Sequence, residues 1–239
     1  EKFVDCRSKD VSIRELYIVE GDSALGSCKL ARQAEFQAIM PIRGKILNCL
    51  KADYNHILKN DIIIDLIKVM GCGIELGNKG KNLAEFNLDN LKFSKIIICT
   101  DADVDGYQIR ALILTMIYRL MPTLINVGKV YIAETPLYEI NCKDKTYFAY
   151  TDKEKDDILK KLGDKKYTIQ RSKGLGENEP EMMSLTTMHP DTRRLIKVMP
   201  EDVERTARMF DILLGNDLPG RKIYIAENGS KYLELADIS

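Results

Sequence analysis

Residues 95–106 read KIIICTDADVDG, a β-branched run that leads directly into a cluster of acidic residues. The run at 95–100 is apolar enough to form a strand that is covered on both faces, as strands of parallel sheets are. A helical pattern follows the acidic cluster and extends to about Leu120, where Pro122 ends it. In open α/β sheets, ligands bind outside the carboxyl ends of the strands. The stretch therefore predicts a buried strand whose carboxyl end carries a functional site.

The acidic cluster consists of Asp101, Asp103 and Asp105, at every second position. Anions packed this closely repel one another unless a cation compensates them. A solvated acidic turn is the alternative, and the apolar strand that feeds the cluster speaks against it. An EF-hand calcium loop begins with the same pattern, but it needs a glutamate at its twelfth position and a helix before it. Here the twelfth position is Leu112 and a strand comes first, which excludes an EF-hand.

A second apolar run, LYIVE at residues 16–20, ends in Glu20. If this strand lies beside 95–100, Glu20 and Asp101 meet at the same edge of the sheet. One carboxylate from each strand suits Mg²⁺, which keeps several waters and takes few protein ligands. The sequence has only two histidines, so a bound metal must be a hard cation held by oxygen. We therefore predict a divalent-metal site of Glu20, Asp101 and Asp103.

The remaining first half also alternates strands and helices. The pattern predicts strands at 36–42 and 130–133 and helices at 23–32 and 62–70. Asp61 is the expected cap of the helix at 62–70, and Gly71 its expected end. This alternation is typical of an α/β unit with a mainly parallel sheet.

The pattern changes after about residue 145. We expect a hairpin arm, a solvated charged helix, a short strand and two further helices, at 146–151, 152–162, 167–171, 200–214 and 221–227. Two basic loops stand out: PIRGKILN, with Arg43 and Lys45 around Gly44, and the KGLGE segment that begins at Lys173. The first is either a contact for phosphate or bases or an exposed basic turn. The second, as part of residues 171–177, is either a loop that cradles a phosphate or a flexible turn, and the residues alone leave these interpretations open.

Composition limits the class of protein. The chain has 239 residues, 45% hydrophobic and 30% charged, as expected for a globular protein with one sizeable core and a smaller second one. Lysine plus arginine equals aspartate plus glutamate, 36 against 36, whereas a stand-alone DNA-binding domain is usually basic. If the chain binds nucleic acid, it must therefore do so through a local surface and together with partner proteins. The six cysteines form no CxxC pair and are expected to be free thiols.

The ends and the apolar segments carry further expectations. Glu1 stands where an initiator methionine is expected, so the chain is expected to be a piece of a longer protein. Its first ten residues lack the apolar core of a signal peptide. The most apolar helical stretch, 109–121, is interrupted by Arg110 and Arg119, so no bilayer span is expected.

Five motifs, taken in order, resemble one family. They are EGDSA at 20–24, PIRGKILN at 41–48, DADVDG at 101–106, KGLGE at 173–177 and TTMHPDTRRL at 186–195. Together they resemble the B subunits of bacterial type IIA DNA topoisomerases, the family that includes the B subunits of DNA gyrase and of topoisomerase IV.

The resemblance implies a fold and a set of domains. It implies an entry linker at 1–13, followed at 14–136 by a Toprim domain, which is Rossmann-like with a mainly parallel sheet flanked by helices. A connecting hairpin and helix at 137–166 would lead to a smaller α+β tail, the gyrase B-type C-terminal region at 167–239. The family's ATP-binding domain would precede Glu1.

The resemblance also implies an activity and partners. The chain would supply the Mg²⁺-binding half of a DNA cleavage and religation centre, in an ATP-dependent enzyme that passes one DNA duplex through another. An A subunit would supply the attacking tyrosine in an A₂B₂ complex acting on double-stranded DNA in the cytoplasm, without a membrane. The fragment alone would be inactive.

For the metal site, the resemblance implies individual roles. Glu20 would be the general acid–base and share one Mg²⁺ with Asp101, while Asp101 and Asp103 would hold a second Mg²⁺. Asp105 would be auxiliary, and Mn²⁺ or Ca²⁺ could substitute for Mg²⁺. Such parts meet the needs of metal-assisted phosphoryl transfer, namely charge neutralisation at the phosphate and a positioned proton donor.

Further residues are implied to contact DNA or drugs. The implied DNA contacts are Lys45, Asn48, Gln108 and Lys173. Asp22 and Arg43 would line the pocket for quinolone-like poisons. The chain departs from the family pattern at Tyr107 and Gln108, where a small residue and a histidine are usual, and Gln108 cannot carry a proton at neutral pH.

Two other classes of function use related features. Toprim nucleases and primases share the metal layout but lack the KGLGE and TTMHPDTRRL segments. A non-catalytic scaffold that binds DNA or a partner would be favoured by loss of Glu20 or Asp101, and both are present.

Overall fold

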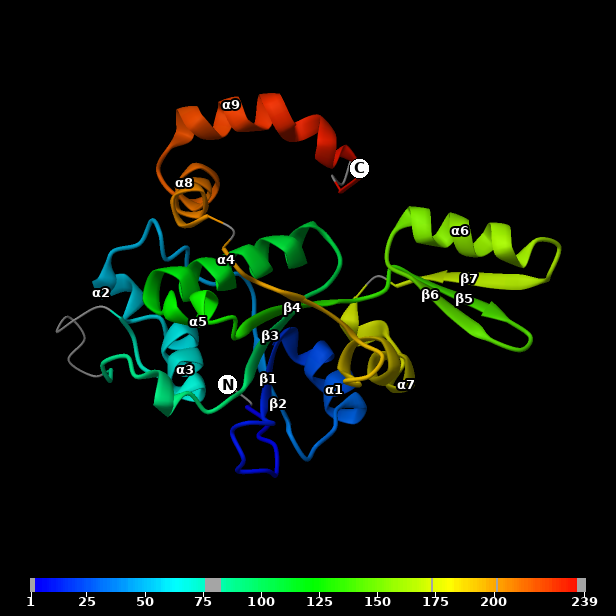
Figure 1. The fold of residues 1–239 in the computed structure, drawn as a ribbon, viewed down its shortest axis with the longest axis horizontal. Coiled ribbons are helices and arrows are strands. Elements are labelled where there is room, and N and C mark those ends of the chain that lie inside the picture. The colour runs from blue at the N-terminus through cyan, green and yellow to red at the C-terminus, as the bar shows by residue number, and fades with distance from the viewer. Residues whose placement is uncertain (1–2, 76–82, 173, 201, 236–239) are drawn as a thin grey trace.

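The computed structural model describes residues 3–75, 83–172, 174–200 and 202–235. Figure 1 shows a central sheet with helices on both faces, a smaller unit of β5, β6, β7 and α6 that projects to one side, and a last pair of helices above α4. Within the described ranges, no helix is long and apolar enough to cross a membrane.

The central sheet has the strand order β2-β1-β3-β4-β8. Strands β1 (Glu15–Glu20), β2 (Gln37–Ile42), β3 (Lys95–Cys99) and β4 (Val130–Glu134) run parallel, and β8 (Arg194–Lys197) is antiparallel to β4. The predicted mainly parallel sheet is confirmed. The sequence patterns predicted each of these strands except β8.

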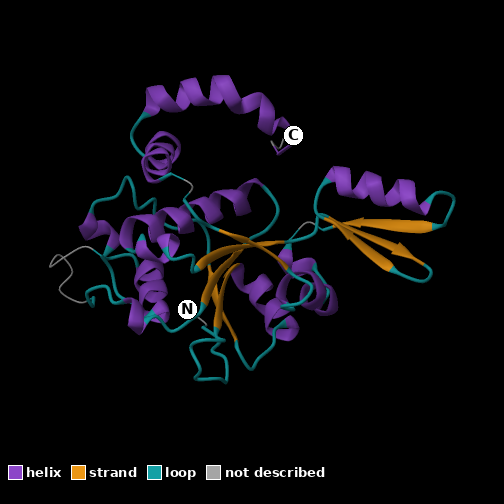
Figure 2. Cartoon of the chain, in the orientation of Figure 1, coloured by secondary structure: helices purple, strands orange, loops and turns teal. Residues whose placement is uncertain are grey.

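Helices cover the two faces of this sheet separately (Figure 2). One face is covered by α3 (Asp61–Met70), α4 (Val104–Leu120) and α5 (Thr123–Asn126), and the other by α1 (Gly21–Ala31). Two short helical turns, α2 (Tyr54–Ile57) and Leu88–Asn90, lie in the connection between β2 and β3. The cap of α3 differs from the prediction. The side chain of Asn60 accepts the hydrogen bond from the Ile63 amide, and Asp61 is already helical.

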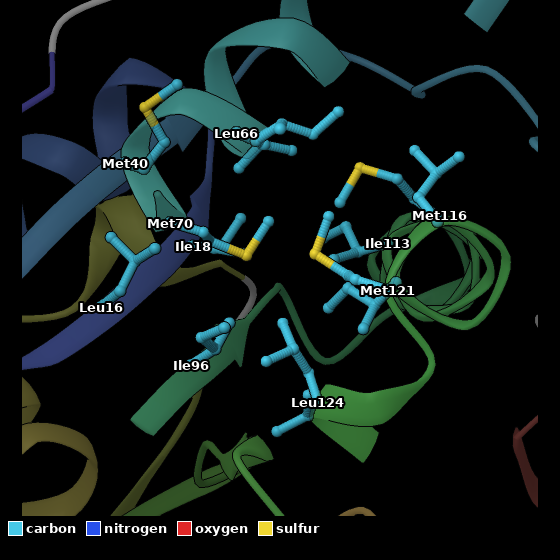
Figure 3. Packing of buried hydrophobic residues seen from close by; sticks show 14 of the residues in the cluster. Leu16, Ile18, Met40, Leu66, Met70, Ile96, Ile113, Met116, Met121 and Leu124 are labelled. Atoms are coloured by element: carbon cyan, nitrogen blue, oxygen red, sulfur yellow. The ribbon is translucent and has the colours of Figure 1, made fainter. Parts of the chain in front are cut away.

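The alternation of side chains along β1 explains why both faces need a cover. Leu16 and Ile18 point into the larger core, whereas Tyr17 and Val19 point into the smaller one. In Figure 3 the side chains of the larger core converge from strands and helices, and the labelled ones include Leu16, Ile18, Met40, Ile96, Leu66, Met70, Ile113, Met116, Met121 and Leu124. In β3, Ile96 and Ile98 belong to the larger core and Ile97 and Cys99 to the smaller one, which confirms the prediction that this strand is covered on both faces.

The C-terminal half returns to this sheet. The turn Leu175–Glu177, helix α7 (Pro180–Met183) and a π-helical turn (Ser184–Met188) lie beside α1. Their apolar side chains Leu175, Met183 and Met188 complete the smaller core before the chain forms β8. The smaller core is thus built from segments that are distant in sequence.

The projecting unit is a three-stranded antiparallel sheet with one helix. Its strands are β5 (Tyr138–Cys142), β6 (Thr146–Ala149) and β7 (Tyr167–Arg171), in the order β6-β5-β7. Helix α6 (Asp152–Leu162) is capped by the Thr151 side chain, which accepts from the Glu154 amide. The predicted helix at 152–162 and the predicted strand at 167–171 are confirmed, whereas the hairpin arm ends two residues earlier than predicted.

The last helices are α8 (Val203–Leu214) and α9 (Leu218–Asn228), followed by a 3₁₀ segment, Gly229–Leu235. The Asp202 side chain caps α8, so this helix begins after the predicted residue 200, and α9 begins before the predicted residue 221. Phe210 of α8 stacks on Tyr118 of α4, with ring centroids 4.2 Å apart. All six cysteines are free thiols, as expected.

Candidate metal centre

Glu20 and Asp101 meet at the carboxyl edge of the sheet. Strands β1 and β3 are neighbours with Val19 opposite Cys99, so Glu20 at the end of β1 lies next to the segment that leaves β3. The backbone N–H of Asp101 donates to Oε2 of Glu20 over 3.4 Å. The structure thus brings together the two carboxylates that the sequence placed on neighbouring strands.

The loop after residue 173 closes over Asp101. The backbone N–H of Leu175 donates to Oδ1 of Asp101 over 2.8 Å. A Cβ atom on Gly174 would lie 3.1 Å from Oδ2 of the same carboxylate, so the glycine allows the loop to approach closely. Sequence reasoning missed this contact, although the paired glycines of KGLGE were the available signal. Lys173 itself lies outside the described residues.

The electrostatics of both carboxyl groups favour their protonated forms. Partial burial raises the pKa of Glu20, and the charges of Asp101, Asp103 and Asp105 raise it further, against the hydrogen bond from the Asp101 amide. Burial also raises the pKa of Asp101, as do the charges of Asp103 and Glu177, against the hydrogen bond from Leu175. A cation bound at this edge would offset both the cost of burying the charged carboxylates and the repulsion between them.

The two other aspartates are held by nearby donors. Oδ1 of Asp103 accepts from the Gly106 amide over 2.7 Å and caps α4. Oδ1 of Asp105 lies 2.8 Å from Nζ of Lys45, and both side chains are exposed. No three histidine, cysteine or acidic side chains in the described ranges lie close enough together to hold a metal ion in this arrangement. The oxygen-only donors of Glu20 and Asp101 nevertheless fit a hard cation that keeps most of its waters.

The PIRGKILN loop lies against the same edge. Arg43 forms an ion pair of 2.6 Å with Asp22, so the structure brings together the two residues predicted for a drug pocket. Asn48 is engaged at both ends of its amide. Its Nδ2 donates to the Leu214 carbonyl and its Oδ1 accepts from the Leu50 amide. Gln108 is exposed on α4, in the turn that follows the aspartates.

A buried polar network, which sequence reasoning also missed, fixes the tail on the sheet. The guanidinium of Arg193 donates to both carboxylate oxygens of Glu15, over 2.5 and 2.6 Å, and to the hydroxyl of Tyr17. Tyr17 in turn donates to the Thr187 carbonyl. Gln37 donates to Glu15 and to the Met188 carbonyl. The TTMHPDTRRL motif therefore includes an arginine whose side chain is buried.

Gly176 is expected to be intolerant of a side chain. A Cβ atom there would lie 2.5 Å from Cβ of Ser23 in α1, so Gly176→Ala should push the loop away from α1 and lower the free energy of unfolding by about 1–3 kcal/mol. Denaturant unfolding measures this loss. Gly26→Ala, in the same helix with no atom within 4 Å of the added Cβ, is the control and should be neutral or stabilising by up to about 1 kcal/mol. Equal stability of the two variants would show that the loop does not rest on α1.

Comparisons with known proteins agree with this geometry. The model of the Toprim domain matches residues 15–135, half of the chain, and the model described as DNA gyrase B subunit, carboxyl terminus, matches residues 164–226. The chain is 47% identical over 234 residues to the DNA gyrase B subunit of Thermotoga maritima, and the match covers 98% of this chain and 36% of that protein. It is 48% identical over 236 residues to the DNA gyrase B subunit of Clostridium acetobutylicum, with 98% and 36% covered.

A third relative is the DNA gyrase B subunit of Thermus thermophilus, 45% identical over 234 residues, with 98% of this chain and 36% of that protein covered. The chain spans about a third of the length of these curated relatives. The chain therefore belongs to the Toprim family and joins a Toprim domain to a DNA gyrase B carboxyl-terminal domain, as the resemblance of its motifs predicted.

Proposed function

We propose that this chain supplies the metal-binding half of the DNA cleavage and religation centre of a type IIA topoisomerase. The observation that carries the proposal is the pairing of Glu20 with Asp101 at the carboxyl edge of the sheet, where burial raises the pKa of both groups and neighbouring carboxylates raise each further. The domain boundaries predicted from the sequence belong to the same proposal. The names of the relatives support a partner subunit. The resemblance implies that this A subunit supplies the attacking tyrosine, in an A₂B₂ complex that works in the cytoplasm.

Glu20 is the proposed general acid–base. Its raised pKa brings the carboxyl group closer to the range in which it can both hold and release a proton near neutral pH. In the cleavage direction Glu20 would protonate the 3′-oxygen that leaves the phosphorus, and in the resealing direction it would remove that proton. The Asp101 amide orients the carboxylate through Oε2.

The donor set suits two Mg²⁺ ions, for which Mn²⁺ or Ca²⁺ could substitute. Glu20 and Asp101 would hold one ion, Asp101 and Asp103 would hold the second, and Asp105 would be auxiliary. When bound, Mg²⁺ supplies charge neutralisation at the phosphate. The hydrogen bond from Leu175 fixes Asp101, the ligand common to both ions. ATP would bind only in the family's ATP-binding domain.

The proposed DNA contacts are those that the resemblance implies. The ammonium group of Lys45 lies 2.8 Å from Asp105 and would exchange that carboxylate for a DNA phosphate. Gln108 and Lys173 are further proposed DNA contacts. Asn48 is better suited to hold the loop against α8 than to bind DNA, because both ends of its amide are occupied. Arg43 and Asp22 stay the proposed drug contacts.

The test of the proposal is reconstitution with a cognate A subunit. The mixture should cleave supercoiled DNA in the presence of Mg²⁺ and stop when the metal is chelated. A mixture that binds DNA but never cleaves it contradicts the proposal.

Metal binding should depend on Asp101 more than on Asp103. Asp101→Asn removes a negatively charged ligand from both proposed ions, and Asp103→Asn removes one from a single ion. We expect calorimetric titration with Mn²⁺ to show at least about tenfold weaker binding of both ions in Asp101→Asn, since even outer partners of a metal contribute 10- to 100-fold. Asp157→Asn on exposed α6 is the matched control and should bind as the wild type does. Equal losses in the two site variants would reject Asp101 as the shared ligand.

The purified chain alone should neither nick nor relax supercoiled DNA. The proposed reaction needs a tyrosine from the A subunit, so incubation with Mg²⁺ should leave the plasmid supercoiled on an agarose gel. Nicking that the pure chain performs and Glu20→Gln abolishes would instead identify a Toprim-type nuclease.

A further inference from the structure

The projecting unit is attached to the body at the metal-centre edge. Strand β5 begins just after β4 leaves the carboxyl edge of the central sheet, and β7 ends just before Gly174, whose loop contacts Asp101. The five-residue strands and the eleven-residue α6 each span about 16 Å. The turns at 143–145 and 163–166 therefore lie about 16 Å from the attached end, and Figure 1 shows the unit extending away from the body.

Charge is distributed unevenly along this unit. At the attached end the acidic residues are engaged: Asp152 accepts from Tyr138 and pairs with Lys155, and Glu154 pairs with Arg194. At the far end Lys143, Lys165 and Lys166 are exposed, and in the described part of the chain no carboxylate pairs with them. Asp144 and Asp164 are exposed in the same turns without an ion pair to these lysines, so the far end carries an excess of positive charge and not positive charge alone.

Other lysines near the far end already have a role within the chain. Lys160 and Lys161 occupy the last turn of α6, where positive charge compensates the carbonyl end of the helix. Nζ of Lys145 lies 4.9 Å from the ring centroid of Tyr147. Lys143, Lys165 and Lys166 instead border an open hollow of about 630 Å³, which Asp164 and Tyr167 also line.

We propose that Lys143, Lys165 and Lys166, the basic tip, bind the phosphate backbone of duplex DNA beside the cleavage site. The proposal rests on the proposed function, which places a duplex at the edge where the unit is attached. A reach of about 16 Å corresponds to about five base pairs at 3.4 Å each. The hollow is open, and its three lysine ammonium groups outnumber the single carboxylate of Asp164, which suits an extended backbone better than an enclosed nucleotide. Such contacts position a duplex without reading its sequence.

The experiment compares two triple variants that lose the same charge. The tip variant is Lys143→Gln/Lys165→Gln/Lys166→Gln, and the control is Lys51→Gln/Lys59→Gln/Lys68→Gln, exposed positions near α2 and α3. Fluorescence anisotropy gives the affinity of each chain for a labelled duplex of about thirty base pairs at several KCl concentrations. The corresponding triple Lys→Arg variant of the tip keeps the positive charge, so it shows whether a change of side-chain shape alone alters DNA binding.

We expect the tip variant to lose about 2.7 from the slope of log affinity against log salt, at 0.9 per phosphate contact. Between 50 and 200 mM salt, the wild type should then lose about 40-fold more affinity than the tip variant does. The control and the Lys→Arg variant should keep the wild-type slope. An unchanged slope in the tip variant, or an equal loss in the control, overturns the proposal.

The basic tip and the metal centre can fail independently. Cleavage by the mixture with the A subunit, combined with an unchanged slope in the tip variant, rejects the tip and keeps the proposed function. A reduced slope in the tip variant without any Mg²⁺-dependent cleavage keeps the tip as a DNA site and rejects the proposed function. Binding of the wild-type chain that shows no salt dependence rejects the tip as well.

Discussion

Glu20→Gln should lower the rate of Mg²⁺-dependent DNA cleavage by the reconstituted enzyme by about 10²–10⁴-fold, the usual contribution of a positioned general acid or base. The amide keeps the shape of the side chain but cannot transfer a proton. Single-turnover cleavage with the A subunit in excess measures the effect. Glu35→Gln, at an exposed position in the connection between α1 and β2, is the control and should cleave as the wild type does. Undiminished cleavage by Glu20→Gln would exclude this residue as the proton carrier.

Glu20→Gln should lower activity but raise the stability of the metal-free chain. The pKa of Glu20 is raised in the folded chain, so the residue favours folding below its unfolded pKa and this contribution is lost as pH rises through the folded pKa. In the absence of metal, Glu20→Gln should therefore gain stability relative to the wild type as pH rises from about 4 to 7. Thermal unfolding at these pH values, without Mg²⁺, measures the gain. A variant that loses both activity and fold would contradict this assignment.

Arg193→Met should lower the free energy of unfolding by about 3–5 kcal/mol, because it leaves the buried carboxylate of Glu15 without its main partner. Arg194→Met removes the neighbouring arginine from an exposed pair with Glu154 and should cost about 0–1 kcal/mol. Urea unfolding of the two variants separates these effects. Similar small losses in both would mean that the Arg193–Glu15 pair does not hold the tail to the sheet.

The loss in Arg193→Met should also depend on pH. Burial alone would raise the pKa of Glu15, but hydrogen bonds from Arg193 and Gln37 and the charges of Arg193 and Lys95 outweigh it, so the pKa lies below its usual value. A lowered pKa stabilises the fold above the unfolded pKa, and this contribution is lost as pH falls through the folded pKa. The difference in free energy of unfolding between the wild type and Arg193→Met should therefore become smaller below about pH 4. If this difference in free energy of unfolding stays constant from about pH 7 to pH 3, the variant loses packing contacts and not the charge interaction with Glu15.

The parts of the fold and the site that the sequence could predict depend on local pattern. The β-branched run before Asp101 and the apolar run before Glu20 identify two strands by themselves. The general rule about strand ends then places the two carboxylates at one edge, as the hydrogen bond from Asp101 to Glu20 shows. The helices at 152–162 and after Asp103 were predictable for the same reason, since their periodicity and their ends are local.

The parts that the sequence could not predict depend on distant partners. The glycines that flank Leu175 indicate a close approach of the backbone, but they do not identify Asp101 as the acceptor of the Leu175 amide. Nothing near Arg193 indicates that a carboxylate on β1 will neutralise it. The short strand β8 has exposed side chains and no alternating pattern, so its pairing with β4 is set by the tail that delivers it. At Asn60 and Asp61, two good capping residues are adjacent, and the backbone decides which one caps the helix.

The order of synthesis gives this late closure of the sheet a consequence for the cell. Strands β1 to β4 leave the ribosome first. The backbone edge of β4 stays unpaired until β8 forms beside it, with Arg194 opposite Glu134 in the sheet. The face that carries Tyr17 and Ile97 likewise stays partly uncovered until Met183 and Met188 arrive. Open edges and bare apolar faces are sites of aggregation in nascent chains. A chaperone that shields this face should therefore be needed longest just before residues 175–197 emerge, and a truncation before that point should yield insoluble protein.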